Sequence, residues 1–203
     1  MNPVLQSNDP ARARPSREQR GAELLRWARE CLRDALGGPT ANPPTAAWTR
    51  ERGATFVSLH WPDGELQGCI GSLEAHQSLA DDVARNAVAA GTRDPRGRWL
   101  ELDDVDELDI EVSILSPLEP LEFGSEAEAK ALVRPGIDGL LLEARGRRGT
   151  LLPVVWESLP EVDEFFGALK RKAGLPADYW SDDVRLWRYT VELHRDRARG
   201  VRP

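Results

Sequence analysis

One cysteine of this chain lies in an extended stretch between two glycines, in the run Gly68-Cys69-Ile70-Gly71. Such a cysteine is a candidate nucleophile or thiolate ligand, because the thiolate is the reactive form of the side chain. Glycines inside a strand indicate a bulge or a close approach of a ligand or another backbone. Free cysteine is also among the most buried residue types, so plain packing remains the alternative for Cys69.

A carboxylate and a hydroxyl lie on a second strand that we expect to neighbour the cysteine. Residues 108–115 alternate apolar and polar side chains, which places Glu111 and Ser113 together on the face away from the core. By the same alternation we expect Gln67 and Cys69 to share a face. The candidate catalytic residues are therefore Cys69 and Glu111, the latter as a proton acceptor. The alternative for Glu111 is a solvated strand carboxylate.

The remaining candidates come from the cysteine stretch, from a turn and from a hairpin tip. In the turn Asp94-Pro95-Arg96, the aspartate and the arginine are candidates for a pocket rim, and the alternative is simple turn initiation. Arg148 is a candidate cation, and the alternative is a solvated hairpin tip. The candidate substrate-binding residues are Gln67, Gly68, Gly71, Ser72, Asp94, Arg96, Ser113 and Arg148.

The elements that must position these residues follow a repeated order. Asp63-Gly64 predicts a tight turn between strands at 55–61 and 66–70, and Ser78 predicts the start of a helix that ends at Gly91. The order hairpin, helix, returning strand occurs over residues 55–115 and again over 138–194. We therefore predict an α+β fold, a mainly antiparallel curved sheet with packed helices and two pseudo-repeated halves. Further helices are expected at 16–36, 125–132 and 161–173, and a single last strand at 184–194.

Composition and charge exclude several classes of function. The sequence predicts a flexible arm at 1–15, one domain at 16–194 and a basic tail at 195–203. Without the arm and the tail, the body carries 21 basic and 32 acidic residues, which disfavours binding to nucleic acid. No apolar run is long enough to cross a bilayer, and no secretory signal is evident, so we expect no membrane partner and a cytoplasmic location. Two cysteines suit a reducing compartment.

No cofactor or metal is expected from the sequence. His60, His76 and His194 are scattered rather than clustered with cysteines as zinc ligands are. The glycine-rich patterns that cradle phosphate groups do not occur.

Several motifs, in order, resemble one family. They are Gly68-Cys69-Ile70-Gly71-Ser72-Leu73-Glu74, Asp94-Pro95-Arg96, the stretch 110–120, the stretch 146–153, the stretch 169–176 and Tyr179-Trp180. Together they resemble the AMMECR domain family, whose bacterial members are called AmmeMemoRadiSam system protein A. The resemblance covers roughly residues 16–194 and implies an α+β fold with two similar halves.

The resemblance implies partners rather than a reaction. It implies association with a Memo-like protein and with a radical S-adenosylmethionine protein, and it implies a site centred on the cysteine. The sequence departs from the family pattern at Gln67, where an arginine is usual, at Gly97, where a phenylalanine is usual, and at Val154, where a glutamine is usual. The loss of the arginine removes a cation that would favour a thiolate or hold an anionic group.

Two functions remain open at the level of sequence. The first is a component of that system whose cleft binds a small ligand or a partner protein. The alternative is an enzyme that uses Cys69 as a nucleophile or thiolate ligand. Neither a substrate nor an oligomeric state follows from the residues.

Overall fold

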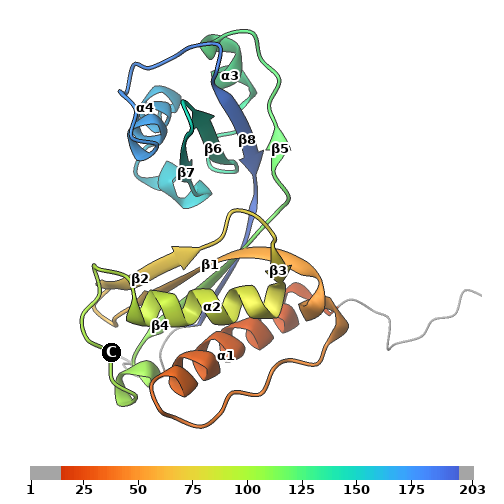
Figure 1. Ribbon diagram of the computed structural model, residues 1–203, viewed down its shortest axis with the longest axis vertical. Helices are drawn as coiled ribbons and strands as arrows, with labels where there is room; N and C mark the ends of the chain where they lie inside the picture. Colours follow the sequence, from red (N-terminus) through yellow and green to blue (C-terminus); the bar gives the residue numbers. More distant parts are fainter. Residues whose placement is uncertain (1–14, 197–203) are drawn as a thin grey trace, which may run out of the picture.

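The computed structural model describes residues 15–196, and the expected N-terminal arm lies almost wholly outside that range. The chain forms two lobes (Figure 1). The first lobe contains a sheet of order β2-β1-β4-β9, with β3 paired to β1, and the second contains a sheet of order β5-β8-β6-β7. Every strand pairing is antiparallel. The predicted α+β class with antiparallel sheets is confirmed.

The bounds of the elements follow the chain. The first lobe is built from α1 (Arg17–Ala35), η2 (Ala47–Arg50), β1 (Arg52–His60), β2 (Leu66–Gly71), β3 (Gln77–Ser78), α2 (Leu79–Thr92), η3 (Asp103–Asp106) and β4 (Asp109–Leu115), together with β9 (Val191–Asp196). The second lobe is built from β5 (Glu119–Pro120), α3 (Glu126–Leu132), β6 (Gly139–Ala144), β7 (Arg147–Leu151), η4 (Pro153–Glu157), α4 (Val162–Lys172) and β8 (Arg185–Tyr189).

The two lobes repeat one topology. In the first, β1 lies between its hairpin partner β2 and the later strand β4, and α2 connects the hairpin to β4. In the second, β6 lies in the same way between β7 and β8, with α4 before β8. Both hairpin turns contain a glycine at positive φ, Gly64 and Gly146, as tight turns require. The predicted repeat of hairpin, helix and strand is therefore confirmed at the level of topology.

Two crossing segments join the lobes. The chain passes from β4 of the first lobe to β5 of the second, and it later returns from β8 to β9 (Figure 1). Both strands that follow a crossing, β5 and β9, lie at the edge of their sheets. At the crossing, the backbone N–H of Ser116 donates to the carbonyl of Thr190, and the N–H of Thr190 donates to the Ser116 hydroxyl. The single strand expected at 184–194 is thus two strands. Thr190 separates them because the two partners belong to different sheets.

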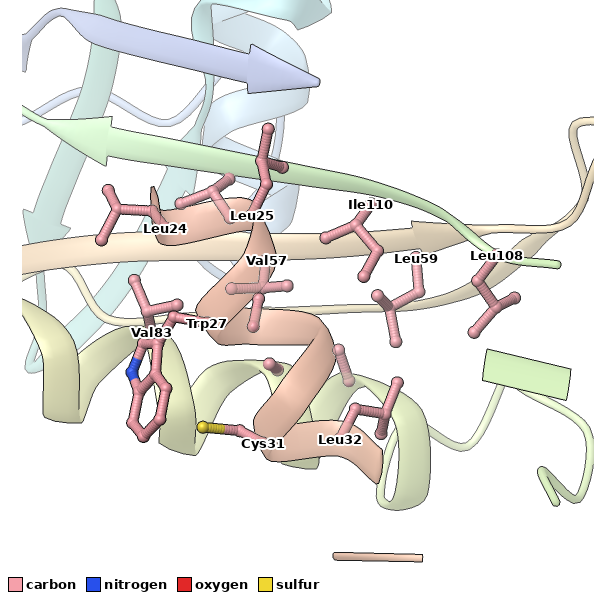
Figure 2. Packing of buried hydrophobic residues seen from close by; sticks show 14 of the residues in the cluster. Leu24, Leu25, Trp27, Cys31, Leu32, Val57, Leu59, Val83, Leu108 and Ile110 are labelled. Carbon is pink, nitrogen blue, oxygen red and sulfur yellow. The ribbon is translucent and has the colours of Figure 1, made fainter. Parts of the chain in front are cut away.

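Each lobe has its own apolar core. In the first, α1 and α2 cover one face of the sheet, and Leu24, Leu32, Val57 and Ile110 are fully buried between them (Figure 2). In the second, Phe165, Phe166 and Leu169 of α4 pack on β6. A small third cluster around Tyr189 lies where the lobes meet. The opposite face of the first sheet is directed toward the second lobe.

Serine caps begin the helices where the sequence predicts them. Ser16 and Gln19 form a reciprocal capping box at α1, and Ser78 and Ser125 accept from backbone amides at the starts of α2 and α3. The aspartates of the first turn of α2 suit its positive end. Within residues 15–196, no helix has both the length and the apolar character needed to cross a membrane.

Candidate functional site

A row of polar side chains crosses the face of the first sheet that lies opposite α1 and α2. Ser58 of β1 lies directly opposite Cys69 of β2 on one side and Glu111 of β4 on the other, and Glu111 lies opposite Arg195 of β9. Residues directly opposite one another point to the same face, so all four share it. The Ser58 hydroxyl donates to the Cys69 sulfur at 3.2 Å, and Arg195 Nε lies 2.7 Å from Glu111 Oε1. The structure thus places Cys69 and Glu111 on one face with Ser58 between them.

A cleft of about 530 Å³ lies between this row and the second lobe. Its floor is formed by Ser58, Glu111, Ser113, Val191, Leu193 and Arg195. Its wall is formed mainly by η4 and its flanks: Leu152, Pro153, Val154, Trp156, Glu157 and Pro160. We call this space the interlobe cleft. Its volume is typical of sites for small molecules, and the junction of two lobes is a usual place for them.

Contacts with the core of the second lobe position the wall of the interlobe cleft. The indole N–H of Trp156 donates to the carbonyl of Asp138 at 2.7 Å, and its ring stacks on Phe165 with centroids 3.8 Å apart. Pro153 begins η4, where its missing N–H and fixed φ suit the first turn. A mainly apolar wall therefore faces a floor that carries four polar side chains, an arrangement that suits a ligand with an apolar body and a polar head.

Asp94 and Arg96 hold the cysteine strand by its backbone. The Asp94 carboxylate accepts from the Cys69 N–H at 2.9 Å, and Arg96 donates to Asp94 and, at 3.5 Å, to the Cys69 carbonyl. The Arg96 guanidinium and these backbone amides hold the pKa of Asp94 well below its ordinary value of 3.8. Both residues therefore act on the outer edge of β2, where they satisfy polar groups that an edge strand leaves free.

Gln67 does not share a face with Cys69, and the expectation that it does is wrong. The register of β1 and β2 shifts at Leu59 and His60, so β2 carries one extra residue there. This bulge turns Gln67 into the core, where it is only 1% exposed. Its amide donates to the carbonyls of Gly91 and Arg98 and accepts from the Trp61 indole. Those bonds occupy the side chain, so Gln67 is not available to a ligand.

Gly68 and Gly71 leave no open space for a ligand at their own positions, because the chain itself makes the close approach there. A Cβ on Gly68 would overlap the carbonyl oxygen of Ala90, so the missing side chain allows α2 to approach the sheet. A Cβ on Gly71 would overlap the ring of Phe56. The space that each glycine leaves is filled by the chain itself. The close approach inferred from the glycines is real, but what approaches is the protein.

Ser72 belongs to a buried network around Asp82. The Asp82 carboxylate, 1% exposed, accepts from the Thr55 N–H and hydroxyl, the Ser72 hydroxyl, the Gln77 amide and the Asn86 amide. Buried carboxylates require such bonds because desolvation is otherwise too costly. The network fixes α2 on β1, and it explains Ser72 as a structural residue rather than a ligand contact.

Arg148 links the two lobes instead of serving the cysteine. Its guanidinium lies 2.7 Å from Glu74, which follows β2 in the first lobe, and it also approaches Glu143. The pair is half exposed, so its contribution to stability is small. Arg148 is not among the residues that line the interlobe cleft.

A larger hollow of about 950 Å³ lies between α1 and β9 and contains none of the predicted residues. Two of its polar side chains are already paired: Arg29 donates to the carbonyls of Val105 and Leu108, and His194 bonds Glu192 at 2.9 Å. It also borders Asp196, the last residue that the structure describes. Over residues 15–196, no group of three or more histidine, cysteine, aspartate or glutamate side chains is placed to hold a metal ion.

Sequence reasoning missed two residues of the polar row. Arg195 was expected in a basic tail, but β9 extends to Asp196 and pairs Arg195 with Glu111. Little in the sequence indicated this pairing, because Arg195 is followed closely by other arginines and cannot be told apart from them by residue type. Ser58 gave a clearer signal, since it alternates with the apolar residues Val57 and Leu59. The residues of η4 gave none, because their role depends on how the lobes meet.

These features define a class: an α+β protein of two repeated halves with a small-molecule-sized cleft between them. The family model of AMMECR1 matches residues 25–194, and the chain belongs to the AMMECR1 family. It is 36% identical over 191 residues to a protein of Methanothermobacter thermautotrophicus, covering 90% of this chain and 97% of that one. It is 39% identical over 158 residues to a Thermotoga maritima protein, covering 77% and 85%.

A solved structure agrees with the fold. The crystal structure of an uncharacterized protein from Pyrococcus horikoshii superimposes with a TM-score of 0.81 at 30% identity, covering 90% of this chain and 95% of that one. The function of these relatives is not established by their names. Family membership therefore establishes the architecture and identifies no ligand.

Proposed function

We propose that this chain is a binding protein that holds a small ligand in the interlobe cleft. The observation that carries the proposal is the cleft itself, about 530 Å³ in volume, with Glu111, Ser113 and Arg195 on its floor and η4 as its wall. The polar groups fix orientation and the apolar wall supplies affinity, as in most small-molecule sites. A ligand bound there touches both lobes.

A pair of matched variants tests the proposal. Val154 lines the cleft and is 46% exposed, whereas Leu132 of α3 is 42% exposed and lies elsewhere, so tryptophan at either position should leave the fold intact. The protein is incubated with the small-molecule fraction of a cell extract and analysed by native mass spectrometry. Wild type and Leu132→Trp should retain the same small molecule, and Val154→Trp should lose it. Equal retention by all three, or retention by none, would refute the proposal.

A second candidate function is catalysis through the Cys69 thiol. The specific observation in its favour is the 3.2 Å hydrogen bond from the Ser58 hydroxyl to the sulfur, one residue away from the cleft floor along the row. The rate of Cys69 alkylation against pH, compared with a small free thiol, decides the matter. A reactive thiol at neutral pH whose rate falls in Ser58→Ala supports it, and a slow rate that Ser58→Ala leaves unchanged opposes it.

The partners in our proposal are a Memo-like protein and a radical S-adenosylmethionine protein. Support for them comes from family resemblance alone. Purified partners are mixed with wild type and with Cys69→Ala, and complexes are separated by size. Complexes with both proteins favour a component that assembles without its thiol, complexes with wild type only favour a role for the thiol, and no complex with either argues against association.

A further inference from the structure

Two opposite charges, those of Glu111 and Arg195, lie side by side at the interlobe cleft. Arg195 contacts Glu111 through Nε, which lies 2.7 Å from Oε1. A guanidinium has five N–H donors and a carboxylate has two acceptor oxygens. A guanidinium and a carboxylate thus lie side by side at the cavity, with more donors and acceptors than this contact uses. The side chains of Glu111 and Arg195 are 27% and 51% exposed, so a ligand can reach them.

The balance of charge excludes a simple anion or a simple cation as the best ligand. The charged residues that line the cleft are Glu111, Glu157 and Arg195. A ligand with only a carboxylate would be attracted by Arg195 but repelled by the two glutamates. A ligand with only an ammonium would be attracted by the glutamates but repelled by Arg195. A ligand that carries both charges meets an opposite charge with each of them.

The spacing sets the separation of the two ligand charges. Because the guanidinium and the carboxylate touch at 2.7 Å, their partners on the ligand must also be neighbours. An ammonium and a carboxylate on one carbon satisfy this, whereas the two ends of an extended peptide are too far apart. Ser113, on the same strand as Glu111 and two residues on, adds a hydroxyl on the same face of the floor.

The wall specifies the rest of the ligand. Leu152, Pro153, Val154 and Trp156 present apolar surface opposite the polar floor. The cavity is larger than an α-amino carboxylate head requires, which leaves room for a large apolar side chain. We propose, resting on the function proposed above, that the interlobe cleft binds an α-amino acid with a bulky apolar side chain, its carboxylate on Arg195 and its ammonium on Glu111.

The test uses three probes that differ only in the charged head. They are L-phenylalanine, hydrocinnamate, which lacks the amine, and phenethylamine, which lacks the carboxylate. Binding is measured by calorimetry and by amide chemical shifts of the full chain. L-phenylalanine should bind at least ~10-fold more tightly than either analogue, about 1.4 kcal/mol. Glycine, which has the head but no apolar body, should bind more weakly than L-phenylalanine.

Charge-removing variants then test the two pairings separately. In Glu111→Gln the preference for L-phenylalanine over hydrocinnamate should collapse, while in Arg195→Gln the preference over phenethylamine should collapse. Glu164→Gln, an exposed carboxylate on α4, is the matched control and should leave both preferences unchanged. An analogue that binds as tightly as L-phenylalanine, or variants that leave the preferences intact, would overturn the inference.

The outcomes also separate this inference from the function on which it rests. If an analogue but not L-phenylalanine shifts the amides of Ser113 and Val154, and Val154→Trp abolishes the shifts, the amino-acid class is wrong and the cleft stands. If no probe shifts those amides and Val154→Trp also leaves extract-derived ligand in place, both are wrong.

Discussion

Single side chains decide how the cysteine strand is held. Asp94 accepts from the Cys69 N–H, and Arg96 lies against Asp94 and the Cys69 carbonyl. The Asp-Pro-Arg turn therefore acts as a neighbouring strand would, by pairing with the outward-facing backbone of β2. This role differs from the two interpretations that the sequence allowed for the motif, a pocket rim and simple turn initiation.

Replacing Asp94 with asparagine should lower stability in a pH-dependent way. The folded pKa of Asp94 lies below its ordinary value of 3.8, so its contribution is complete above that value and is lost as pH falls toward the folded pKa. Asp94→Asn should cost about 2 kcal/mol at neutral pH and clearly less near pH ~3. Urea unfolding at both pH values measures this. The exposed Asp178→Asn is the control, and a pH-independent loss at Asp94 would contradict the account.

The two cysteines should differ strongly in reactivity. Burial, with nearby Asp34 and Glu30, raises the pKa of Cys31 to about 12, whereas Cys69 is half-buried on the face of its sheet that lies opposite α1 and α2. Iodoacetamide should therefore modify native Cys69 at least ~100-fold faster than Cys31. Mass spectrometry of the labelled peptides gives the two rates, with the urea-unfolded chain as the reference. Comparable rates in the native protein would mean that α1 opens readily.

At the scale of elements, Gly68 of β2 determines how closely α2 packs on the sheet. A methyl group at Gly68 would overlap the backbone of Ala90, which has no flexible end to move aside. Gly68→Ala should destabilise the protein by about 1–3 kcal/mol. Gly167→Ala is the matched control: its Cβ would lie 3.5 Å from the nearest atom, and alanine favours a helix, so stability should rise by about 0.5–1 kcal/mol. Thermal and urea unfolding measure both changes, and a neutral Gly68→Ala would refute the close approach.

Tyr189 anchors the crossing between β8 and β9. It is 1% exposed, its hydroxyl lies 2.7 Å from the Thr150 hydroxyl, and it donates to the Leu151 carbonyl. Tyr189→Phe should cost about 1–2 kcal/mol because it removes the hydrogen bonds of this hydroxyl to Thr150 and Leu151. Tyr179→Phe, whose hydroxyl bonds Ser181 and Asp183 at the surface, should cost less. Equal losses in urea unfolding would show that the crossing does not depend on this buried bond.

The elements were predictable from the sequence to different degrees. Serine caps, the Asp63-Gly64 turn and clean alternation in residues 108–115 are local signals, so the helices, the first hairpin and the placement of Glu111 and Ser113 followed from them. The bulge that turns Gln67 inward is not local, because it arises from pairing with β1. The division of residues 184–194 at Thr190 was equally invisible, since it reflects two different sheets.

At the scale of the whole molecule, the candidate site is a product of the repeat. Each half resembles the other in topology, but the cleft exists only where the polar face of the first sheet meets η4 of the second lobe. Neither Arg195 nor Trp156 could be connected with Glu111 by spacing, because 84 positions separate Glu111 from Arg195 along the sequence and a sheet pairing brings them together. The sequence motifs were sufficient to identify the family, whereas the cleft could be found only from the tertiary structure.

The most direct test of the central claim is a pair of amide chemical-shift maps recorded as the small-molecule fraction of a cell extract is added to wild type and to Val154→Trp. The account predicts that the largest shifts in wild type fall on Glu111, Ser113, Val154 and Arg195, and that they disappear in the variant. Shifts concentrated instead around Gly21 and Arg29, at the hollow between α1 and β9, or shifts that persist unchanged in the variant, would contradict it.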